Sequence, residues 1–117
     1  MWLGPGWQAG IRREWRLTRL ALLAAPTGFF QAPAALEPVR LPTFAWVGSA
    51  DDITPPAQTE WLANALHEQL AVDVRVTEGA GHFSCMDMGP PHTVESLPDK
   101  PAFLRELSDE VCKFVQA

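Results

Sequence analysis

His82 and Asp51 are the two residues whose types and surroundings indicate acid–base chemistry. His82 lies in the glycine-containing run Glu78–Phe83, and Asp51 lies thirty-one residues earlier, in the run Gly48–Pro55. An imidazole accepts a proton from a hydroxyl when a carboxylate bonded to its other nitrogen fixes the tautomer and stabilises the imidazolium. An acid loop followed by a histidine loop is the order of the second half of a Ser/Asp/His system. We therefore predict His82 as a base and Asp51 as the carboxylate that orients it.

The neighbouring Asp52 is an alternative for the acid. The chain turns from a strand end into a helix near Pro55, and a negative charge at a helix start is favoured by the helix dipole. One of the two aspartates can serve that helix start while the other contacts the histidine. We favour Asp51 for the histidine and keep Asp52 as the alternative.

A nucleophile to complete such a system is not evident in the sequence. A serine nucleophile lies on a strained strand-to-helix turn with the pattern Gly, any residue, Ser, any residue, Gly. No serine of the chain lies between two glycines at that spacing, and Gly6–Gly10 contains no serine. A thiolate beside a histidine is also a competent nucleophile, but Cys85 follows the histidine turn and has no assignable oxyanion donors. We expect the nucleophile to be absent from this chain.

Metal chemistry is not expected from the remaining candidates. His82, Asp87 and His92 are five residues apart in each step, a spacing that matches no zinc-site pattern. We therefore expect no metal and no other cofactor. Three apolar side chains follow the histidine closely in sequence: Phe83, Met86 and Met88. We expect them to line a pocket beside His82 or to pack in the core.

Three apolar runs predict the strands that carry the two loops. Leu17–Ala25 is a continuous apolar run of the kind that forms a strand buried on both faces. Thr43–Val47 predicts a second buried strand. In Val72–Thr77, valines alternate with polar residues, which predicts a shorter strand nearer the sheet edge. The acid loop and the histidine loop follow the second and third of these strands.

Helices and a connector complete the predicted fold. Phe29–Val39 is expected to be a connector, and Pro55–Leu70 a helix capped by Thr54. Asp99 is expected to cap a last helix, whose apolar face comprises Leu104, Leu107, Val111, Phe114 and Val115. This order favours an α/β fold with about three mostly parallel strands flanked by helices, and with the loops at the carboxyl edge of the sheet.

Composition limits the classes of partner. The chain has 117 residues, enough for one domain, and its net charge of −5 leaves no basic stripe for nucleic acid. Both cysteines, Cys85 and Cys112, are interpreted as free thiols. The apolar run after Arg19 has six residues, shorter than the core of a secretion signal, about seven to fifteen. No stretch approaches the ~20 apolar residues of a membrane span, so we expect a cytoplasmic protein with no membrane partner.

Three segments together carry a resemblance to a known family. The chain resembles the C-terminal half of an α/β hydrolase in the segments Leu20–Gly28, Pro42–Pro56 and Glu78–Asp87. The helix that reaches Phe114 follows these segments and completes the resemblance. The likeness is to the dienelactone-hydrolase-like group related to platelet-activating-factor acetylhydrolase. It covers residues 15–117.

The resemblance implies a serine-dependent hydrolase of small-molecule esters, with Asp51 as the triad acid and His82 as the triad base. The first strands, the oxyanion loop and the serine elbow of that family have no counterpart here, and neither does the elbow cysteine of dienelactone hydrolases proper. We therefore expect a partial hydrolase domain over residues 17–117, with residues 1–16 as a ragged remnant of the helix after the missing elbow. Such a truncated chain is expected to be inactive alone.

An alternative of another class is a non-catalytic binding or assembly module. A domain without its earlier strands exposes a sheet edge, and exposed edges pair with other chains. The module would keep its loops as a ligand pocket or pair with an N-terminal half on another chain. Self-association through the same edge is a further expectation.

Overall fold

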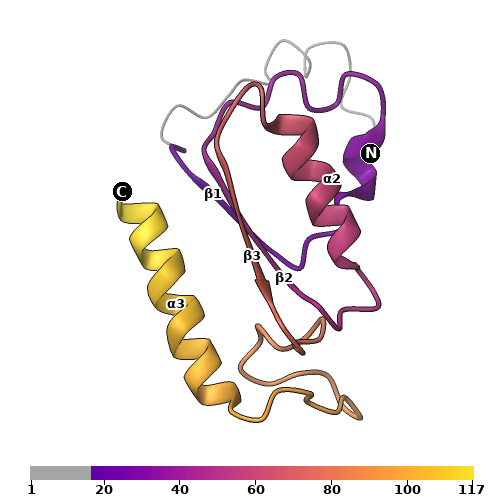
Figure 1. The fold of residues 1–117 in the computed structure, drawn as a ribbon, viewed down its shortest axis with the longest axis vertical. Coiled ribbons are helices and arrows are strands. Elements are labelled where there is room, and N and C mark those ends of the chain that lie inside the picture. Colours follow the sequence, from indigo (N-terminus) through magenta and orange to yellow (C-terminus); the bar gives the residue numbers. More distant parts are fainter. Residues whose placement is uncertain (1–16) are drawn as a thin grey trace, which may run out of the picture.

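A computed structural model describes residues 17–117, with the side chain at position 29 excepted. The elements follow one another as predicted, strand, connector, strand, helix, strand, helix, and the connector contains a short 3-10 helix (Figure 1). Their bounds are β1 Leu20–Leu23, η1 Thr27–Gln31, β2 Thr43–Gly48, α2 Pro56–Leu66, β3 Val72–Thr77 and α3 Lys100–Gln116.

The three strands form one parallel sheet in the order β1-β2-β3. Leu23 of β1 is opposite Trp46 of β2, and Trp46 is opposite Arg75 of β3. Parallel strands need crossover connections, and the long segments between the strands supply them. The predicted α/β class and parallel pairing are confirmed.

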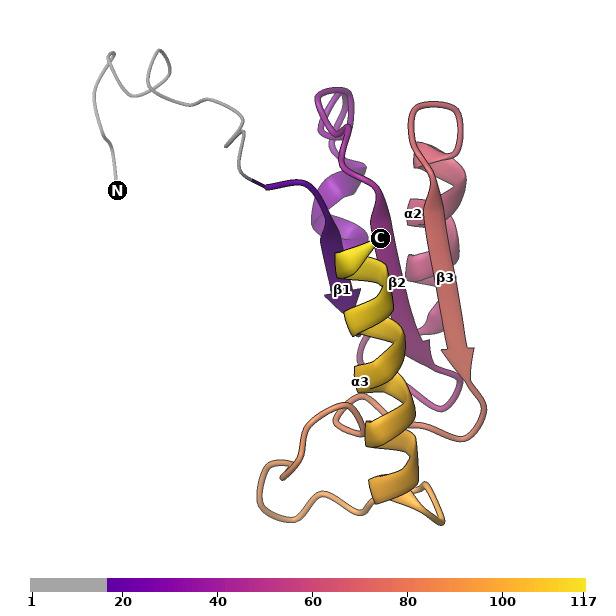
Figure 2. The same cartoon turned by 90° about the vertical axis from the view of Figure 1, so that its left-hand side faces the viewer.

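The central strand β2 organises the core. All six of its residues are buried, as predicted. Phe44 and Trp46 belong to the main cluster of buried residues, and Phe103 and Phe114 of α3 pack against that cluster. Figure 2 shows α3 on one face of the sheet and α2 on the other. Successive side chains of a strand point to opposite faces, so β2 is covered on both sides.

The first strand is shorter and more exposed than predicted. We expected a strand buried on both faces over Leu17–Ala25, but β1 comprises four residues, of which Leu20 and Leu23 are exposed. Within the described residues β1 pairs with β2 alone, and this one-sided pairing leaves its apolar side chains uncovered. The prediction of burial thus holds for Ala24, which is 7% exposed and belongs to the core, and fails for the two leucines.

Helix α2 begins and ends differently from the prediction. Pro55 is the N-cap and Pro56 the first helical residue, and no side chain caps the helix. The predicted capping by Thr54 is wrong because its side chain makes other hydrogen bonds, described below. The helix stops at Leu66 instead of Leu70, and the following residues form turns.

The last strand lies at an edge of the sheet, as predicted, but it is not shorter than the others: β3 has six residues, β2 six and β1 four. Val76 of β3 is 49% exposed, so the expected alternation of burial fails there. Asp99 caps α3, as predicted, by accepting a hydrogen bond from Ala102 N. Val115 lies outside the packed face of α3, while Phe103, which was not predicted, packs on Trp46 with the ring centroids 5.4 Å apart.

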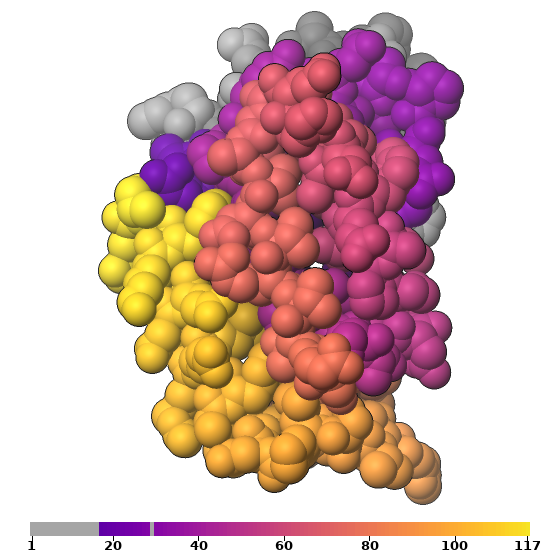
Figure 3. Space-filling model, viewed as in Figure 1, coloured from indigo at the N-terminus to yellow at the C-terminus, as the bar shows by residue number. Residues whose placement is uncertain are grey.

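The predicted N-terminal remnant, residues 1–16, lies outside the described residues. Within residues 17–117, no helix is both long and apolar enough to cross a membrane. The segment after β3 and the start of α3 form one end of the molecule (Figure 3).

Candidate functional site

Asp51 lies in the loop that leaves the buried end of β2. Its backbone N–H donates to Gly48 O at 3.1 Å. Its carboxylate oxygen Oδ1 accepts from the N–H groups of Ile53 at 2.9 Å and Thr54 at 2.8 Å. Aspartate side chains commonly accept hydrogen bonds from backbone two residues on in such turns. The loop therefore fixes one carboxylate oxygen and leaves Oδ2 for a second partner.

The histidine loop leaves β3 and is bonded directly to the acid loop. Ala50 N donates to Ala80 O at 2.9 Å, and Gly79 N donates to Ser49 Oγ at 2.7 Å. Gly79 has φ +81°, and a Cβ at Gly48 would lie 2.1 Å from Ala80 O. Glycine is required at both positions, by the left-handed backbone in one case and by the close approach of two main chains in the other.

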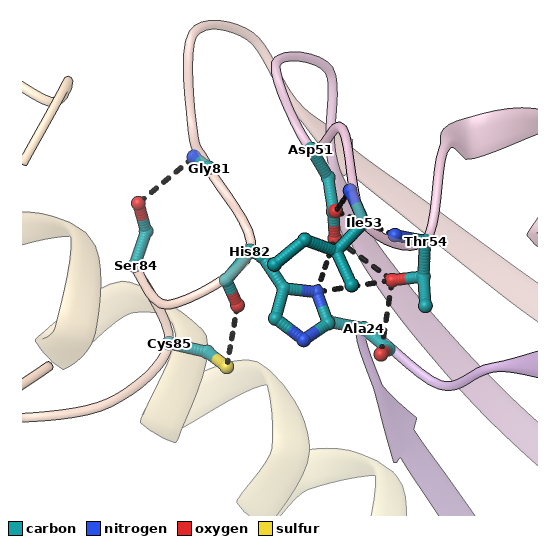
Figure 4. Close-up of polar contacts among 8 residues, drawn as sticks. All are labelled: Ala24, Asp51, Ile53, Thr54, Gly81, His82, Ser84 and Cys85. Atoms are coloured by element: carbon teal, nitrogen blue, oxygen red, sulfur yellow. Dashed lines mark hydrogen bonds and ion pairs between the residues drawn. The ribbon is translucent and has the colours of Figure 1, made fainter. Parts of the chain in front are cut away.

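The structure brings Asp51 and His82 together. The His82 ring points toward the Asp51 carboxylate (Figure 4), with Nδ1 2.9 Å from Oδ2. The Asp51 side chain is 0% exposed and that of His82 is 21% exposed. An ionised carboxylate only accepts hydrogen bonds, so Nδ1 carries the proton in the neutral ring. Nε2 then presents a lone pair, and no described residue forms a hydrogen bond with it.

Asp52, the alternative acid, does not contact the histidine ring by a hydrogen bond or an ion pair. It is exposed and lines a cavity of about 270 Å³ beside His82. Asp51 performs both roles that the sequence divided between two aspartates: it bonds the histidine and holds the turn before α2.

Thr54 is a site residue that sequence reasoning missed. Its hydroxyl lies 3.1 Å from His82 Nδ1, 2.9 Å from Asp51 Oδ2 and 3.1 Å from Ala24 O. A threonine directly before a helix that begins with proline usually indicates a helix cap, which is the role that the sequence predicts for Thr54. The only feature of the sequence that could have placed Thr54 in the site is its position three residues after Asp51. Any residue of a turn can have that spacing, so it does not distinguish a site residue.

A second hydrogen-bond network supports the histidine loop from its other side. Ser84 Oγ accepts from Gly81 N at 2.9 Å and donates to Glu95 Oε2 at 2.7 Å. The other carboxylate oxygen of Glu95 lies 3.1 Å from Lys100 Nζ, at the start of α3. These contacts tie the residue before His82 to the last helix. This network could not be predicted from local sequence, because its members are scattered between residues 81 and 100.

The two networks affect the acidity of their carboxyl groups in the same direction. Burial by itself raises the pKa of Asp51, but hydrogen bonds from Thr54, His82 and Ile53 outweigh burial and hold that pKa below its ordinary value. Burial likewise raises the pKa of Glu95, and hydrogen bonds from Ser84 and Leu97, with the nearby Lys100, bring it below its ordinary value. Both carboxylates are therefore ionised at neutral pH.

The three predicted pocket residues have different surroundings. Phe83 meets the His82 ring edge-on with the centroids 4.9 Å apart, and it lines the cavity beside His82. Met88 is 83% exposed and lines a separate cavity that also includes Phe83. Met86 is 45% exposed. Of the three, Phe83 is thus the one placed against the histidine.

The other chemically capable residues are not assembled with the histidine ring. Cys85 donates a hydrogen bond to the backbone oxygen of His82 at 4.0 Å, and burial raises the pKa of its thiol, which disfavours the reactive thiolate. Cys85 and Cys112 are both unpaired, as predicted. Within residues 17–117, no group of three or more His, Cys, Asp or Glu side chains is placed to hold a metal, so Asp87 and His92 do not join His82.

Comparison with family models and with curated proteins finds no match for this chain. The fold belongs to the α/β class, with a small parallel sheet between helices. The chemistry of the site is deduced from the geometry of Asp51, Thr54 and His82.

Proposed function

We propose that residues 17–117 are the acid–base half of an α/β-hydrolase domain that hydrolyses a small-molecule ester with a Ser/Asp/His triad. The main support is the 2.9 Å contact between His82 Nδ1 and Asp51 Oδ2. The contact lies at the carboxyl edge of a parallel sheet, where open α/β sheets keep their sites. Acid and base also follow one another along the chain in the order typical of this class.

In the proposed reaction, Nε2 of His82 takes the proton of a serine hydroxyl while the serine oxygen attacks the ester carbonyl. Asp51 stabilises the imidazolium, which then gives its proton to the departing alkoxide as the acyl–oxygen bond breaks. A water molecule next loses a proton to Nε2 and attacks the acyl-serine. The acid is released, and the imidazolium returns a proton to the serine oxygen.

In this proposal the serine comes from another segment or another chain. Ser84 is the serine closest to His82 in sequence, but its oxygen is engaged with Gly81 N and Glu95. Removing the nucleophile from a triad costs on the order of a millionfold in turnover. We therefore expect the 117-residue chain alone to hydrolyse esters no faster than the uncatalysed background.

The test compares the isolated chain with the same protein purified through an affinity tag from the organism that makes it. Both preparations are assayed on p-nitrophenyl acetate and labelled with a fluorophosphonate, which reacts with activated serines. The native preparation should hydrolyse the ester and carry the label on a serine outside residues 17–117. His82→Ala in that preparation should lower kcat by about a thousandfold or more.

The matched control is His67→Ala, because His67 is exposed and hydrogen bonds only to its own helix, at Asn64 O. That variant should keep full activity. The proposal is abandoned if the native preparation has no esterase activity, or if its activity is indifferent to His82→Ala.

A second candidate function is an assembly module without catalysis. It is favoured by the open strands: within the described residues, β1 and β3 each pair with β2 alone, and Leu20 and Leu23 on β1 are exposed. The partner would be a second chain that adds parallel strands beside β1. This candidate predicts a cooperatively melting 117-residue protein whose native complex has no fluorophosphonate-reactive serine. An insoluble or non-cooperative chain would argue against it.

A further inference from the structure

Thr54 lies at the junction of three segments that are far apart in sequence. Its hydroxyl oxygen has polar neighbours at the end of β1 (Ala24 O, 3.1 Å), in the acid loop (Asp51 Oδ2, 2.9 Å) and in the histidine loop (His82 Nδ1, 3.1 Å) (Figure 4). The residue is 5% exposed. A buried hydroxyl with three such neighbours must direct its single proton to one of them.

The neighbours decide where that proton goes. A carbonyl oxygen and an ionised carboxylate accept hydrogen bonds and cannot donate them. Asp51 Oδ2 therefore requires the proton on Nδ1, and with Nδ1 protonated the Thr54 hydroxyl accepts from His82 and directs its own proton to Ala24 O or to Asp51 Oδ2. Nδ1 of His82 then faces two oxygen atoms that both accept its proton. The opposite tautomer, with the proton on Nε2, would set the Nδ1 lone pair against Asp51 Oδ2, and the Thr54 hydroxyl would have to give up its bonds to Ala24 O and Asp51 Oδ2 in order to donate to Nδ1.

The backbone of Ala24 gives independent evidence that the contact with Thr54 is a specific feature of the fold. Its φ is +53°, in the left-handed region, which residues with a Cβ rarely adopt. Its N–H donates to Trp46 O at 2.8 Å and its carbonyl accepts from Thr54. Strained backbone persists where the surroundings over-determine it, and it clusters at functional sites. Here the strained turn aims the carbonyl of Ala24 at the Thr54 hydroxyl.

We propose that Thr54, anchored on the carbonyl of Ala24, is a positioning residue that holds His82 in the tautomer with the proton on Nδ1 and the lone pair on Nε2. The importance of this positioning for catalysis rests on the proposed function. The tautomer and the protection of the Nδ1 proton are properties of the chain itself, and both are measured without any reaction.

The experiment is NMR of the intact 117-residue chain with ¹⁵N-labelled histidines, at alkaline pH. Wild-type His82 should show a protonated Nδ1 and an unprotonated Nε2, with His67 and His92 as internal references. Thr54→Val keeps the shape of the side chain and removes the hydroxyl. Exchange of the His82 Nδ1 proton with water should become about fivefold faster, the size expected for one lost hydrogen bond. Thr54→Ser should keep the wild-type rate.

Thr27→Val is the matched control. Thr27 is also buried, and its hydroxyl donates to a backbone carbonyl, Gln58 O, at 2.7 Å, without touching His82. A general loss of stability would speed exchange in both valine variants, whereas the proposal expects the change in Thr54→Val alone. An equal change in Thr27→Val, or no change in Thr54→Val, overturns the proposal.

The wild-type spectrum is a second measurement, and it can overturn the proposal even where Thr54→Val does not fold. A His82 ring with its proton on Nε2 overturns the proposal. These results are separate from the esterase assay: a native protein without esterase activity, but with the predicted tautomer and with faster exchange in Thr54→Val alone, would discard the hydrolase function and leave the role of Thr54 intact.

Discussion

Asp51 is a buried carboxylate that accepts hydrogen bonds from Ile53 N, Thr54 N, the Thr54 hydroxyl and His82. These bonds favour the ionised form and lower its pKa in the folded protein. In the unfolded chain the pKa returns to about 3.9. The stabilisation is therefore complete above about pH 4 and is lost as the pH falls through the lower, folded pKa.

Asp51→Asn tests this linkage. At neutral pH the variant should be less stable by about 2 kcal/mol, because hydrogen bonds to a charged group contribute about that much. Its stability should also fall less steeply than that of the wild type below about pH 4. Urea unfolding measured from pH 7 to pH 2.5 gives both quantities.

The matched control is Asp52→Asn, which changes an exposed neighbour that makes no hydrogen bond with residues 17–117. It should follow the wild-type curve. Some acid dependence will remain in Asp51→Asn, because the pKa of Glu95 is lowered too and acts with the same sign. Parallel curves for the wild type and Asp51→Asn would contradict the prediction.

The acid loop and the histidine loop act as one unit because their main chains touch. Gly48 ends β2, and a Cβ at this position would lie 2.1 Å from Ala80 O, a distance that only a backbone shift can relieve. Gly48→Ala should therefore cost about 2–3 kcal/mol and separate the loops that hold Asp51 and His82. Thermal and urea unfolding measure the loss.

Gly28→Ala is the control for that substitution, because a Cβ there would meet nothing within 4 Å. It should leave stability unchanged or slightly raised, since alanine restricts the unfolded chain more than glycine does. Equal effects of the two substitutions would show that the contact between the loops is unimportant.

The support from α3 reaches the histidine loop through Ser84 and Glu95. Ser84→Ala removes the acceptor of Gly81 N and one donor to Glu95. The loss should cost about 1 kcal/mol, the usual net contribution of a hydrogen bond, because Gly81 is half-buried and Glu95 exposed, so that water can reach the partners left behind. Hydrogen exchange at Gly81 should become at least about fivefold faster. Ser108→Ala, on the exposed side of α3, should change neither, and an unprotected Gly81 in the wild type would contradict the prediction.

The sheet of the molecule has two open edges within residues 17–117. The edge strands β1 and β3 each pair only with β2. Exposed strand edges associate with other chains, and a lysine on the edge opposes this. We expect the wild-type chain to self-associate as its concentration rises, and Leu20→Lys, on β1, to reduce that association. Sedimentation velocity provides the measurement. Val115→Lys, on exposed α3 surface, is the control and should behave like the wild type.

Much of this architecture could be predicted from local sequence. The apolar run Thr43–Val47 and the segment Val72–Thr77 became β2 and β3 almost to the residue, and Asp99 caps the last helix. The expectation that Asp51 and His82 lie together follows from the same reasoning, because the carboxyl ends of adjacent parallel strands meet at one edge of a sheet. The exposure of β1 could not be predicted, because an apolar run does not reveal how many neighbours its strand has.

Local sequence patterns are sufficient to predict the order of the elements, the parallel pairing of the strands and the two loops that contain Asp51 and His82. These depend on local apolar patterns and on turn residues, which are written in consecutive positions. Three contacts are seen only in the folded chain: Asp51 and not Asp52 bonds His82, Thr54 bonds Asp51 instead of capping α2, and Ser84 bonds Glu95 beside the histidine loop. Each of these depends on which atoms come within about 3 Å of one another, often across some thirty residues, and local patterns carry no such distances.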